Sequence, residues 1–312
     1  MKSFTIGAND DGKRLDRYIT KVLTAGGGAI YKALRKKKIK VNGRRVTDGG
    51  IRLACGDVIE MYINDELFAA RDGAVLAAPN GEPSVVYEDK HIIIMDKPAG
   101  LLSQADGSAD SLEGRMRRYL YKNGEYLPNE SISFTPSLCH RIDRNTAGLV
   151  IGAKDAESLR ILNRKIKDRE IKKFYLCETE GTPSPARGEI HGWLKKNESD
   201  RKMMFYDGFA DGAAECRTLY RVIKGGKTAL VEAELITGRT HQLRAGFAHI
   251  GHPLVGDVKY GAKNDGKKRY QHLASYRLVF SYTTDGGILD YLNGREFKKP
   301  HAAFGSETEG LV

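Results

Sequence analysis

The chain carries, at residues 139–150, the stretch Cys-His-Arg-Ile-Asp-Arg-Asn-Thr-Ala-Gly-Leu-Val. Short apolar runs flank its polar residues, which predicts strands around a charged loop. Loops held by a rigid sheet commonly carry reactive groups. Adjacent arginines would keep the Asp143 carboxylate ionised, as a nucleophile or a general base requires. Asp143 is therefore a candidate catalytic residue, although a structural ion pair with Arg141 or Arg144 would produce the same local pattern.

Three further segments show a comparable mixture of glycine, charged and aromatic residues. They read DKPAGLLS at 96–103, KKFYLC at 172–177, and LITGRTHQLR at 235–244, the last continued by GHPLVGDVKYG at 251–261. Taken singly, each has an ordinary explanation, because tyrosines in strands are usually packing residues and glycines often mark turns. Their presence together with the first stretch in one chain is the stronger signal.

The sequence around these segments predicts a large α+β domain over residues 85–300. Strand-like runs occur at 85–87, 92–95, 138–143, 148–152, 174–177, 216–222, 229–235 and 276–280. Asp155 is placed to cap a helix whose apolar positions are Leu159, Leu162 and Ile166. Because strands and helices do not alternate regularly, we expect an extended, mostly antiparallel mixed β-sheet flanked by helices and loops.

A small α/β unit is predicted over residues 1–64. Its elements are helices at 14–24 and 29–38 separated by glycines at 26–28, a hairpin at Asn42-Gly43, and a strand at 58–63. Residues 65–84 contain glycines and prolines with little periodicity and are expected to form a linker. Residues 301–312 have little to bury and are expected to form a lightly packed tail.

Basic residues dominate the small unit. The chain of 312 residues has 51 lysines and arginines against 40 acids, a formal charge of +11, and residues 32–45 contain eight basic side chains and no acidic one. Such a cluster is typical of a surface for nucleic-acid phosphates, although a solvated helix end has the same composition. The candidate RNA-binding residues are Arg35, Lys36, Lys37, Lys38, Arg44 and Arg45.

Composition disfavours several classes of protein. No apolar run approaches the roughly 20 residues of a membrane span, and the N-terminus lacks an apolar signal core, so we expect a cytoplasmic protein without membrane contact. The four cysteines form no CxxC pair, which argues against a zinc ribbon or a disulfide framework. His140, His241, His249 and His252 leave a metal-dependent hydrolase open, but no HExxH-like spacing occurs and we expect no metal.

Together, the four segments resemble the RluA-type pseudouridine synthases. That family carries the blocks DKPxGLLS, HRLDxxTSG, KxY and TGRTHQxR followed by GHPxxGDxxYG, and the match covers about residues 85–280. Ile142 replaces the usual leucine and Ala147 the usual serine, and neither change touches a charged group. Residues 1–64 resemble the RNA-binding domain of ribosomal small-subunit protein four, which many family members carry in front. Glycines stand where that domain usually opens its second helix with polar and basic residues.

The resemblance implies an isomerase that converts uridine in RNA to pseudouridine without a cofactor. The target base must leave its stack to be reached. By resemblance, Asp143 is the catalytic nucleophile, attacking either the sugar or the base. Tyr175 would stack on uracil and take part in proton transfer, and Arg244 would pair with Asp143 and keep it ionised.

Further residues are expected at the substrate. By resemblance, Arg141 fills the gap left by the flipped base, a role that suits a planar cation able to stack and to bind phosphate. Leu243 would pack under the base. His140 and Thr146 lie in the same loop as Asp143 and are assigned to the substrate-binding set, with His140 positioning the loop through hydrogen bonds.

The expected partner is structured RNA. The resemblance favours large-subunit ribosomal RNA, with transfer RNA as the alternative, and the chain is expected to act as a monomer. Two other functions remain open from the residues. A non-catalytic RNA-binding protein would bind without forming product, and a base glycosylase would also flip a base but would release free uracil.

Overall fold

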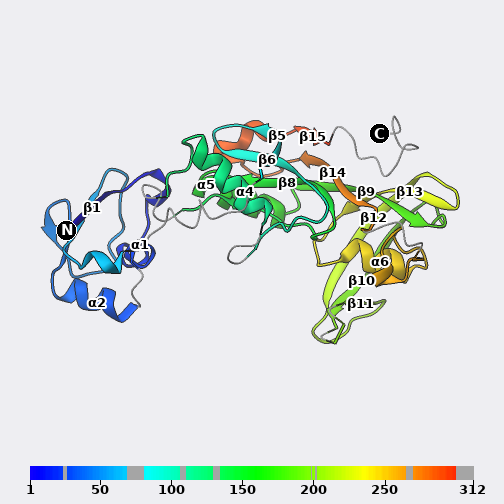
Figure 1. The fold of residues 1–312 in the computed structure, drawn as a ribbon, viewed down its shortest axis with the longest axis horizontal. Helices are drawn as coiled ribbons and strands as arrows, with labels where there is room; N and C mark the ends of the chain where they lie inside the picture. Colours follow the sequence, from blue (N-terminus) through cyan, green and yellow to red (C-terminus); the bar gives the residue numbers. More distant parts are fainter. Residues whose placement is uncertain are drawn as a thin grey trace.

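A computed structural model of the chain describes residues 1–23, 27–68, 81–105, 110–128, 134–197, 199–200, 202–264 and 270–299. The tail at 301–312 and most of the expected linker, residues 69–80, lie outside the described residues. The described residues form two separate sheets, one of four strands near the N-terminus and one of eleven strands in the remainder (Figure 1). No helix in the described part of the chain is long and apolar enough to cross a membrane.

The small N-terminal unit packs two helices on a four-stranded sheet. Its strands are β1 (Lys2–Thr5), β2 (Ile39–Val41), β3 (Arg44–Arg45) and β4 (Val58–Met61), in the order β1-β4-β2-β3. The helices are α1 (Leu15–Val22) and α2 (Gly27–Arg35), and short 3-10 helices span Ala8–Asp10 and Asp65–Leu67. Leu15, Ile19, Leu34 and Ile59 fill the core between these layers.

The predicted hairpin of this unit is confirmed. Asn42 and Gly43 have φ angles of 49° and 76°, as a two-residue turn of this hand requires, and they join β2 to β3. The unit extends a few residues past its expected end at residue 64, because Phe68 packs on its core. The rings of Phe68 and Phe4 have centroids 5.9 Å apart.

The expected boundaries of the second helix are wrong at both ends. Gly27 and Gly28 belong to α2 rather than to the stretch before it. The helix stops at Arg35 because Lys37 adopts a left-handed conformation, with φ 55°. The backbone N–H of Lys38 then donates to the carbonyl of Ala33 (3.0 Å), which closes a Schellman turn. The strand expected to reach residue 63 ends at Met61.

The larger sheet confirms the expected α+β class. Its strands follow the order β11-β10-β12-β13-β9-β14-β8-β6-β5, and all pairs are antiparallel except β14 with β8. The strands are β5 (Ser84–Glu88), β6 (Ile92–Lys97), β7 (Ser137–Leu138), β8 (Ala147–Ala153), β9 (Ile171–Glu180), β10 (Arg187–Lys196), β11 (Met203–Tyr206), β12 (Ala214–Lys224), β13 (Thr228–Leu235), β14 (Leu273–Phe280) and β15 (Glu296–Lys298). β15 pairs with β14, and β7 with β8.

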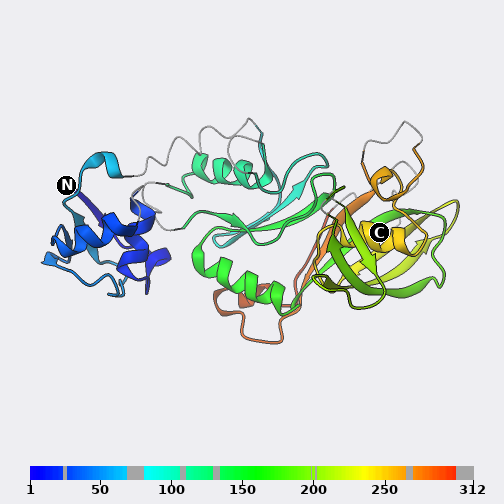
Figure 2. The same cartoon turned by 90° about the horizontal axis from the view of Figure 1, so that it is seen from below.

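Helices cover both faces of this sheet at β6 and β8. Figure 2 shows α4 (Leu112–Lys122) on one side of these strands and α5 (Ala156–Lys167) on the other. The alternation of side chains along β6 explains the arrangement, since Ile93 packs with the α4 side and Ile94 with the α5 side. Asp155 caps α5 as predicted, its carboxylate accepting from the N–H of Ser158 at 2.8 Å.

Some elements differ from the sequence pattern. The run at 138–143 is strand only at Leu138, because the chain then leaves β8 and forms an irregular loop through residue 146. Helix α4 and helix α6 (Gln242–His249) form where no helix is expected. Helix α6 is short and buried along most of its length, so it lacks the polar face that would give a clear helical period.

Candidate active site

The loop that carries Asp143 is held from behind by the 96–103 segment. The hydroxyl of Ser103 donates to the carbonyl of Ile142 (2.7 Å) and accepts from its N–H (3.2 Å). The carbonyl of Arg144 accepts from Lys97 Nζ and from the N–H of Gly100, both at 2.9 Å. The backbone on each side of Asp143 is therefore fixed, and its carboxylate lines the pocket.

Lys97 is a fully buried cation in this support. Its Nζ donates to the carbonyls of Pro98 (3.0 Å), Leu101 (2.7 Å) and Arg144 (2.9 Å). Burial lowers the pKa of Lys97 to about 8, and the nearby charge of Asp143 partly opposes that shift. The three carbonyls occupy the donors of the ammonium, so Lys97 ties loop segments together rather than reaching into the pocket.

Asp143 faces an arginine that is itself tightly held. Its Oδ2 lies 3.6 Å from Nη1 of Arg244. Arg244 donates to both oxygens of the buried Asp257, from Nε (2.7 Å) and from Nη2 (2.8 Å). Burial alone would lower the pKa of Arg244, but the Asp257 hydrogen bond and the charges of Asp257 and Asp143 raise it above its ordinary value. A permanent cation is thus aimed at Asp143.

A histidine lies on the other side of the carboxylate. His241 Nε2 is 3.8 Å from Asp143 Oδ2, and its Nδ1 is 2.7 Å from the hydroxyl of Tyr260. Burial lowers the pKa of His241, so the ring is neutral at pH 7. The Tyr260 hydroxyl also accepts from the N–H of Met203 (2.9 Å). If the hydroxyl donates its own proton to Nδ1, the imidazole proton lies on Nε2, facing Asp143.

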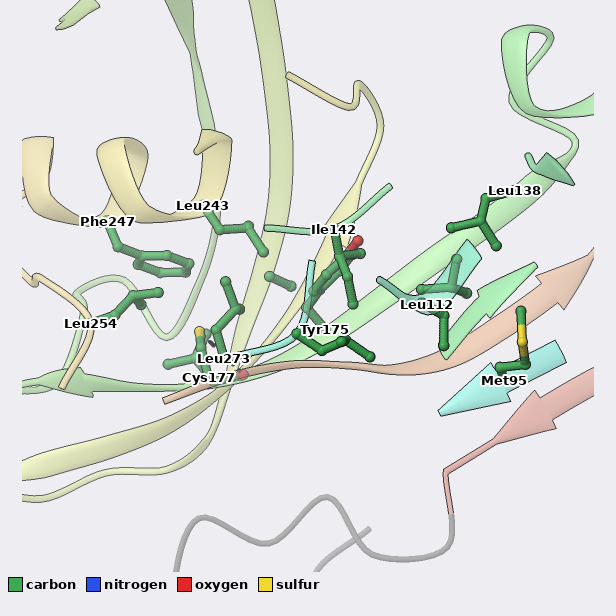
Figure 3. Close-up of a cluster of buried hydrophobic side chains, with 14 of the residues drawn as sticks. Met95, Leu112, Leu138, Ile142, Tyr175, Cys177, Leu243, Phe247, Leu254 and Leu273 are labelled. Atoms are coloured by element: carbon green, nitrogen blue, oxygen red, sulfur yellow. Dashed lines mark hydrogen bonds between the residues drawn. The ribbon is translucent and has the colours of Figure 1, made fainter. Parts of the chain in front are cut away.

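Tyr175 reaches the same place from β9. Its side chain is almost completely buried among apolar neighbours, which include Ile142 and Leu243 (Figure 3). Burial raises the pKa of Tyr175 well above its ordinary value, opposed in part by a hydrogen bond with the Ser275 side chain. The phenol is therefore neutral and can act as a hydrogen-bond donor beside Asp143.

A glycine explains how the loop comes so close to Tyr175. Ser275 of β14 pairs with Gly148 on one side and with Tyr175 on the other. A Cβ on Gly148 would lie 2.0 Å from the carbonyl oxygen of Ser275, and Gly148 has a φ of 113°. Only glycine permits this approach, so Gly148 sets the short path from the Asp143 loop to Tyr175.

The structure brings all the predicted catalytic and substrate-binding residues into one pocket of about 480 Å³. Asp143, Tyr175, Arg244, Arg141, Leu243, His140 and Thr146 all line it. The predicted RNA-binding residues are not part of it. Arg35, Lys36, Lys37, Lys38, Arg44 and Arg45 are exposed on the N-terminal unit.

The two remaining loop residues have structural partners. His140 Nε2 accepts from the N–H of Ile151 (3.2 Å), and burial lowers the pKa of His140 to about 3, so the ring stays neutral. The hydroxyl of Thr146 accepts from Gln271 Nε2 (3.3 Å), and the N–H of Thr146 donates to the carbonyl of Asp143 (3.0 Å). Both residues shape the loop around Asp143.

Several residues at the site have no role assigned from the sequence. Three of them lie within the segments quoted above, namely Asp257, Tyr260 and Ser103. Their place in those segments is the only sequence signal for a role, because the residues that they contact are distant in the chain. Lys167, Arg169 and Arg239 also line the pocket. Within the described part of the chain, no group of three His, Cys, Asp or Glu side chains is arranged to hold a metal ion.

The fold is that of the pseudouridine synthases. A solved structure named human RNA pseudouridylate synthase domain containing 1 superimposes with a TM-score of 0.55 at 21% identity, covering 72% of this chain and 86% of that one. A second, human RNA pseudouridylate synthase domain containing 4, gives a TM-score of 0.52 at 22% identity, covering 63% and 84%. At these identities the likeness concerns the fold.

Sequence relatives establish the family. The model of the family described as RNA pseudouridylate synthase matches residues 91–249, about half of the chain. A ribosomal large subunit pseudouridine synthase C of Rickettsia felis is 31% identical over 266 residues, 80% of this chain and 82% of that protein. An RNA pseudouridine synthase of Mycoplasma capricolum is 28% identical over 298 residues, covering 95% and 96%. The chain belongs to the RNA pseudouridylate synthase family, in its RluA-type branch, and is an isomerase that acts on RNA.

Proposed function

We propose that the chain isomerises specific uridines of large-subunit ribosomal RNA, with Asp143 as the catalytic nucleophile. The observation that carries the proposal is the environment of one carboxylate. Among the described residues that line the pocket, Asp143 is the only acid, and it faces Arg244 at 3.6 Å. A carboxylate that faces the pocket beside a fixed cation suits covalent attack on a flipped nucleotide.

The surrounding residues fit the steps of such an isomerisation. The N1–C1′ bond of uridine breaks, a C5–C1′ bond forms, N1 gains a proton, and the proton of C5 passes to solvent. Tyr175 lines the pocket; in this proposal its ring stacks on the base and its hydroxyl takes part in the proton transfer at C5. Leu243 would pack against the base, and Arg141, exposed at the pocket mouth, would fill the space that the base leaves in the RNA.

Residues 1–64 are proposed to bind structured RNA through the exposed basic residues around Lys37, and residues 85–300 to form the catalytic domain. The relative from Rickettsia felis, named for the ribosomal large subunit, supports ribosomal RNA as the substrate and the cytoplasm as the place of action. Transfer RNA is the alternative substrate.

The test is tritium release from RNA labelled at uracil C5. Bacterial large-subunit ribosomal RNA and transfer RNA transcripts would be incubated with the wild type, with Asp143→Asn, and with Asp211→Asn as the control. Asp211 is an exposed acid outside the pocket. We expect release by the wild type and Asp211→Asn from ribosomal RNA, and none by Asp143→Asn.

Other outcomes would replace the proposal with a specific alternative. Release from transfer RNA alone would move the substrate. Free uracil in the supernatant would indicate a glycosylase. Tight binding of every RNA without release or free base would indicate a binding protein. Undiminished release by Asp143→Asn would remove Asp143 from the catalytic role.

A further inference from the structure

Helix α5 ends at the pocket in a turn that favours glycine but carries arginine. The N–H of Glu170 donates to the carbonyl of Lys165 (2.8 Å), and the N–H of Arg169 donates to that of Ile166 (3.2 Å). These two bonds define a Schellman turn in which the left-handed position is usually glycine. Here that position is Arg169, with a φ of 64°. A side chain kept in an unfavourable backbone conformation points to a function for that side chain.

A buried ion pair fixes this turn in place. Lys165 Nζ lies 2.5 Å from Glu170 Oε2, and the two side chains are 0% and 4% exposed. Lys165 also donates to the carbonyl and hydroxyl of Thr284, and Glu170 accepts from the N–H of Thr283 (3.1 Å). Both ends of the turn are thereby tied to the segment after β14. The cations between them, on Lys167 and Arg169, start from a rigid backbone.

The pocket as a whole is strongly cationic. Of the described residues lining it, six are cations and one is an acid: Arg141, Lys167, Arg169, Lys173, Arg239 and Arg244 against Asp143. Arg244 is paired with Asp257. Among the described residues, no carboxylate forms an ion pair with Lys167, Arg169 or Lys173. Their charge is therefore available to an anionic ligand.

Lys173 is the cation of this group whose burial makes its charge most costly without a ligand. Burial lowers the pKa of Lys173, and its charge adds to the burial that lowers the pKa of His140. Its neighbour Lys172 is exposed and lies outside the pocket. A half-buried ammonium without an acidic partner is costly unless a ligand supplies the opposite charge.

We propose that Arg169, with Lys167 and Lys173, binds the RNA phosphates next to the uridine that enters the pocket. This inference rests on the proposed function and specifies how the RNA strand is held. A nucleotide drawn into the pocket brings a phosphate on each side of its ribose. These phosphates must lie at the rim of the pocket, which in this proposal is formed by Arg169, Lys167 and Lys173. A planar guanidinium on a fixed turn can bind such a phosphate with two parallel hydrogen bonds, and the two lysines add charge beside it.

The deciding variant is Arg169→Gly, because glycine suits the left-handed position and only the cation is lost. Affinity for a fluorescent bacterial large-subunit ribosomal RNA transcript would be measured in the Asp143→Asn background, so that turnover does not interfere. We expect about tenfold weaker binding, as for loss of one hydrogen-bonded charge contact. We also expect a salt dependence shallower by about 0.7 in log K against log salt. The melting temperature should be equal or higher.

Matched variants separate a phosphate contact from a general loss of charge. Lys173→Ala should weaken binding, whereas Lys172→Ala, its neighbour on the other face of β9, should have little effect. Arg169→Lys should restore part of the affinity by returning the charge without the planar fork. Arg160→Ala, an exposed arginine on α5 outside the pocket, should bind like the parent.

The outcomes distinguish this inference from the proposed function. Unchanged affinity and salt slope for Arg169→Gly, or equal losses for Lys172→Ala and Lys173→Ala, would overturn the inference whatever the activity. Weaker binding by Arg169→Gly and Lys173→Ala alone would support it. If the enzyme with intact Asp143 releases no tritium from this transcript, the proposed substrate fails, while the affinity comparison still decides whether the rim binds RNA phosphate.

Discussion

The turns after α2 and α5 share one local structure and differ in their surroundings. Each helix closes with Schellman hydrogen bonds, and each has a basic residue, Lys37 or Arg169, at the position where glycine is favoured. Lys37 lies on an open surface between two other lysines. Arg169 lies on a turn clamped by a buried ion pair and lines the pocket of Asp143.

The difference separates two ways in which positively charged side chains of the protein can bind RNA. Exposed lysines on an open surface attract the phosphate backbone at many positions and carry little geometric information. A cation on a fixed turn that lines the same pocket as Asp143 can define where one nucleotide stops. Variants of the N-terminal unit should therefore change affinity alone, whereas variants around the pocket should change affinity together with placement and rate.

The largest effect on the free energy of unfolding is expected at the buried Lys165–Glu170 ion pair, which fixes the turn after α5. Glu170→Gln would leave the buried Lys165 without its counter-ion, and breaking such a pair costs about 3–5 kcal/mol. Thermal or urea unfolding would measure this loss, with the exposed Glu157→Gln as the control. The double variant Lys165→Met with Glu170→Gln should recover much of the stability, and no recovery would mean that the ion pair is not the source.

The same pair predicts a dependence of stability on acidity. Hydrogen bonds from Lys165 and Thr283 lower the pKa of Glu170 from 4.5 to about 2. Because the folded state holds the carboxylate ionised, its contribution is complete above about pH 4.5 and is lost as the pH falls towards 2. In Glu170→Gln, the decrease of unfolding free energy over this window should be smaller than in the wild type. Equal decreases would assign the window to other carboxylates.

A second large effect is expected in the chemical step. Asp257→Asn keeps the shape of the side chain but removes the charge that holds Arg244 in two hydrogen bonds. We expect kcat to fall about 100-fold, as for a catalytic group displaced by about 1 Å, with RNA affinity nearly unchanged. Glu189→Gln is the control, since it removes an exposed carboxylate partner of Arg217 away from the pocket. An equal loss in both variants would contradict a specific role for Asp257.

The sequence predicted the residues of the candidate site better than the contacts that support them. Asp143, Tyr175 and Arg244 lie in distinctive segments and meet in one pocket, as expected from the resemblance. The contact of Ser103 with Ile142 joins residues 39 positions apart, and that of Lys165 with Thr284 joins residues 119 apart. Such pairings depend on sheet order and on the parallel β8–β14 contact, which no local pattern encodes.

The surface lysines give a smaller and more uniform effect. Replacing Lys36, Lys37 and Lys38 by glutamate should weaken RNA binding about tenfold at low salt. It should also make the salt dependence shallower by about 0.9 for each duplex phosphate contact that is lost. The value of kcat at saturating RNA should not change. Lys21→Glu, an exposed lysine on α1 outside the basic run, serves as the control, and unchanged binding by the triple variant would remove this surface from the RNA interface.

The smallest changes in stability test the comparison most directly, because Lys37→Gly and Arg169→Gly make the same substitution in the same kind of turn. Each should raise the free energy of unfolding by up to about 1 kcal/mol, because glycine removes the strain of a side chain at a left-handed backbone position. The greater entropy that glycine gives to the unfolded chain reduces this gain. Stability would be followed by urea unfolding and RNA affinity at 50 and 200 mM salt. Lys37→Gly should cost about twofold in affinity, and only at low salt, since its neighbours carry the same charge. Arg169→Gly should lose more, and keep part of the loss at high salt, because a hydrogen-bonded phosphate contact survives screening that removes a diffuse one. If Lys37→Gly and Arg169→Gly lost the same affinity at each salt concentration, the buried ion pair that fixes the turn of Arg169 would add nothing to what an open surface provides.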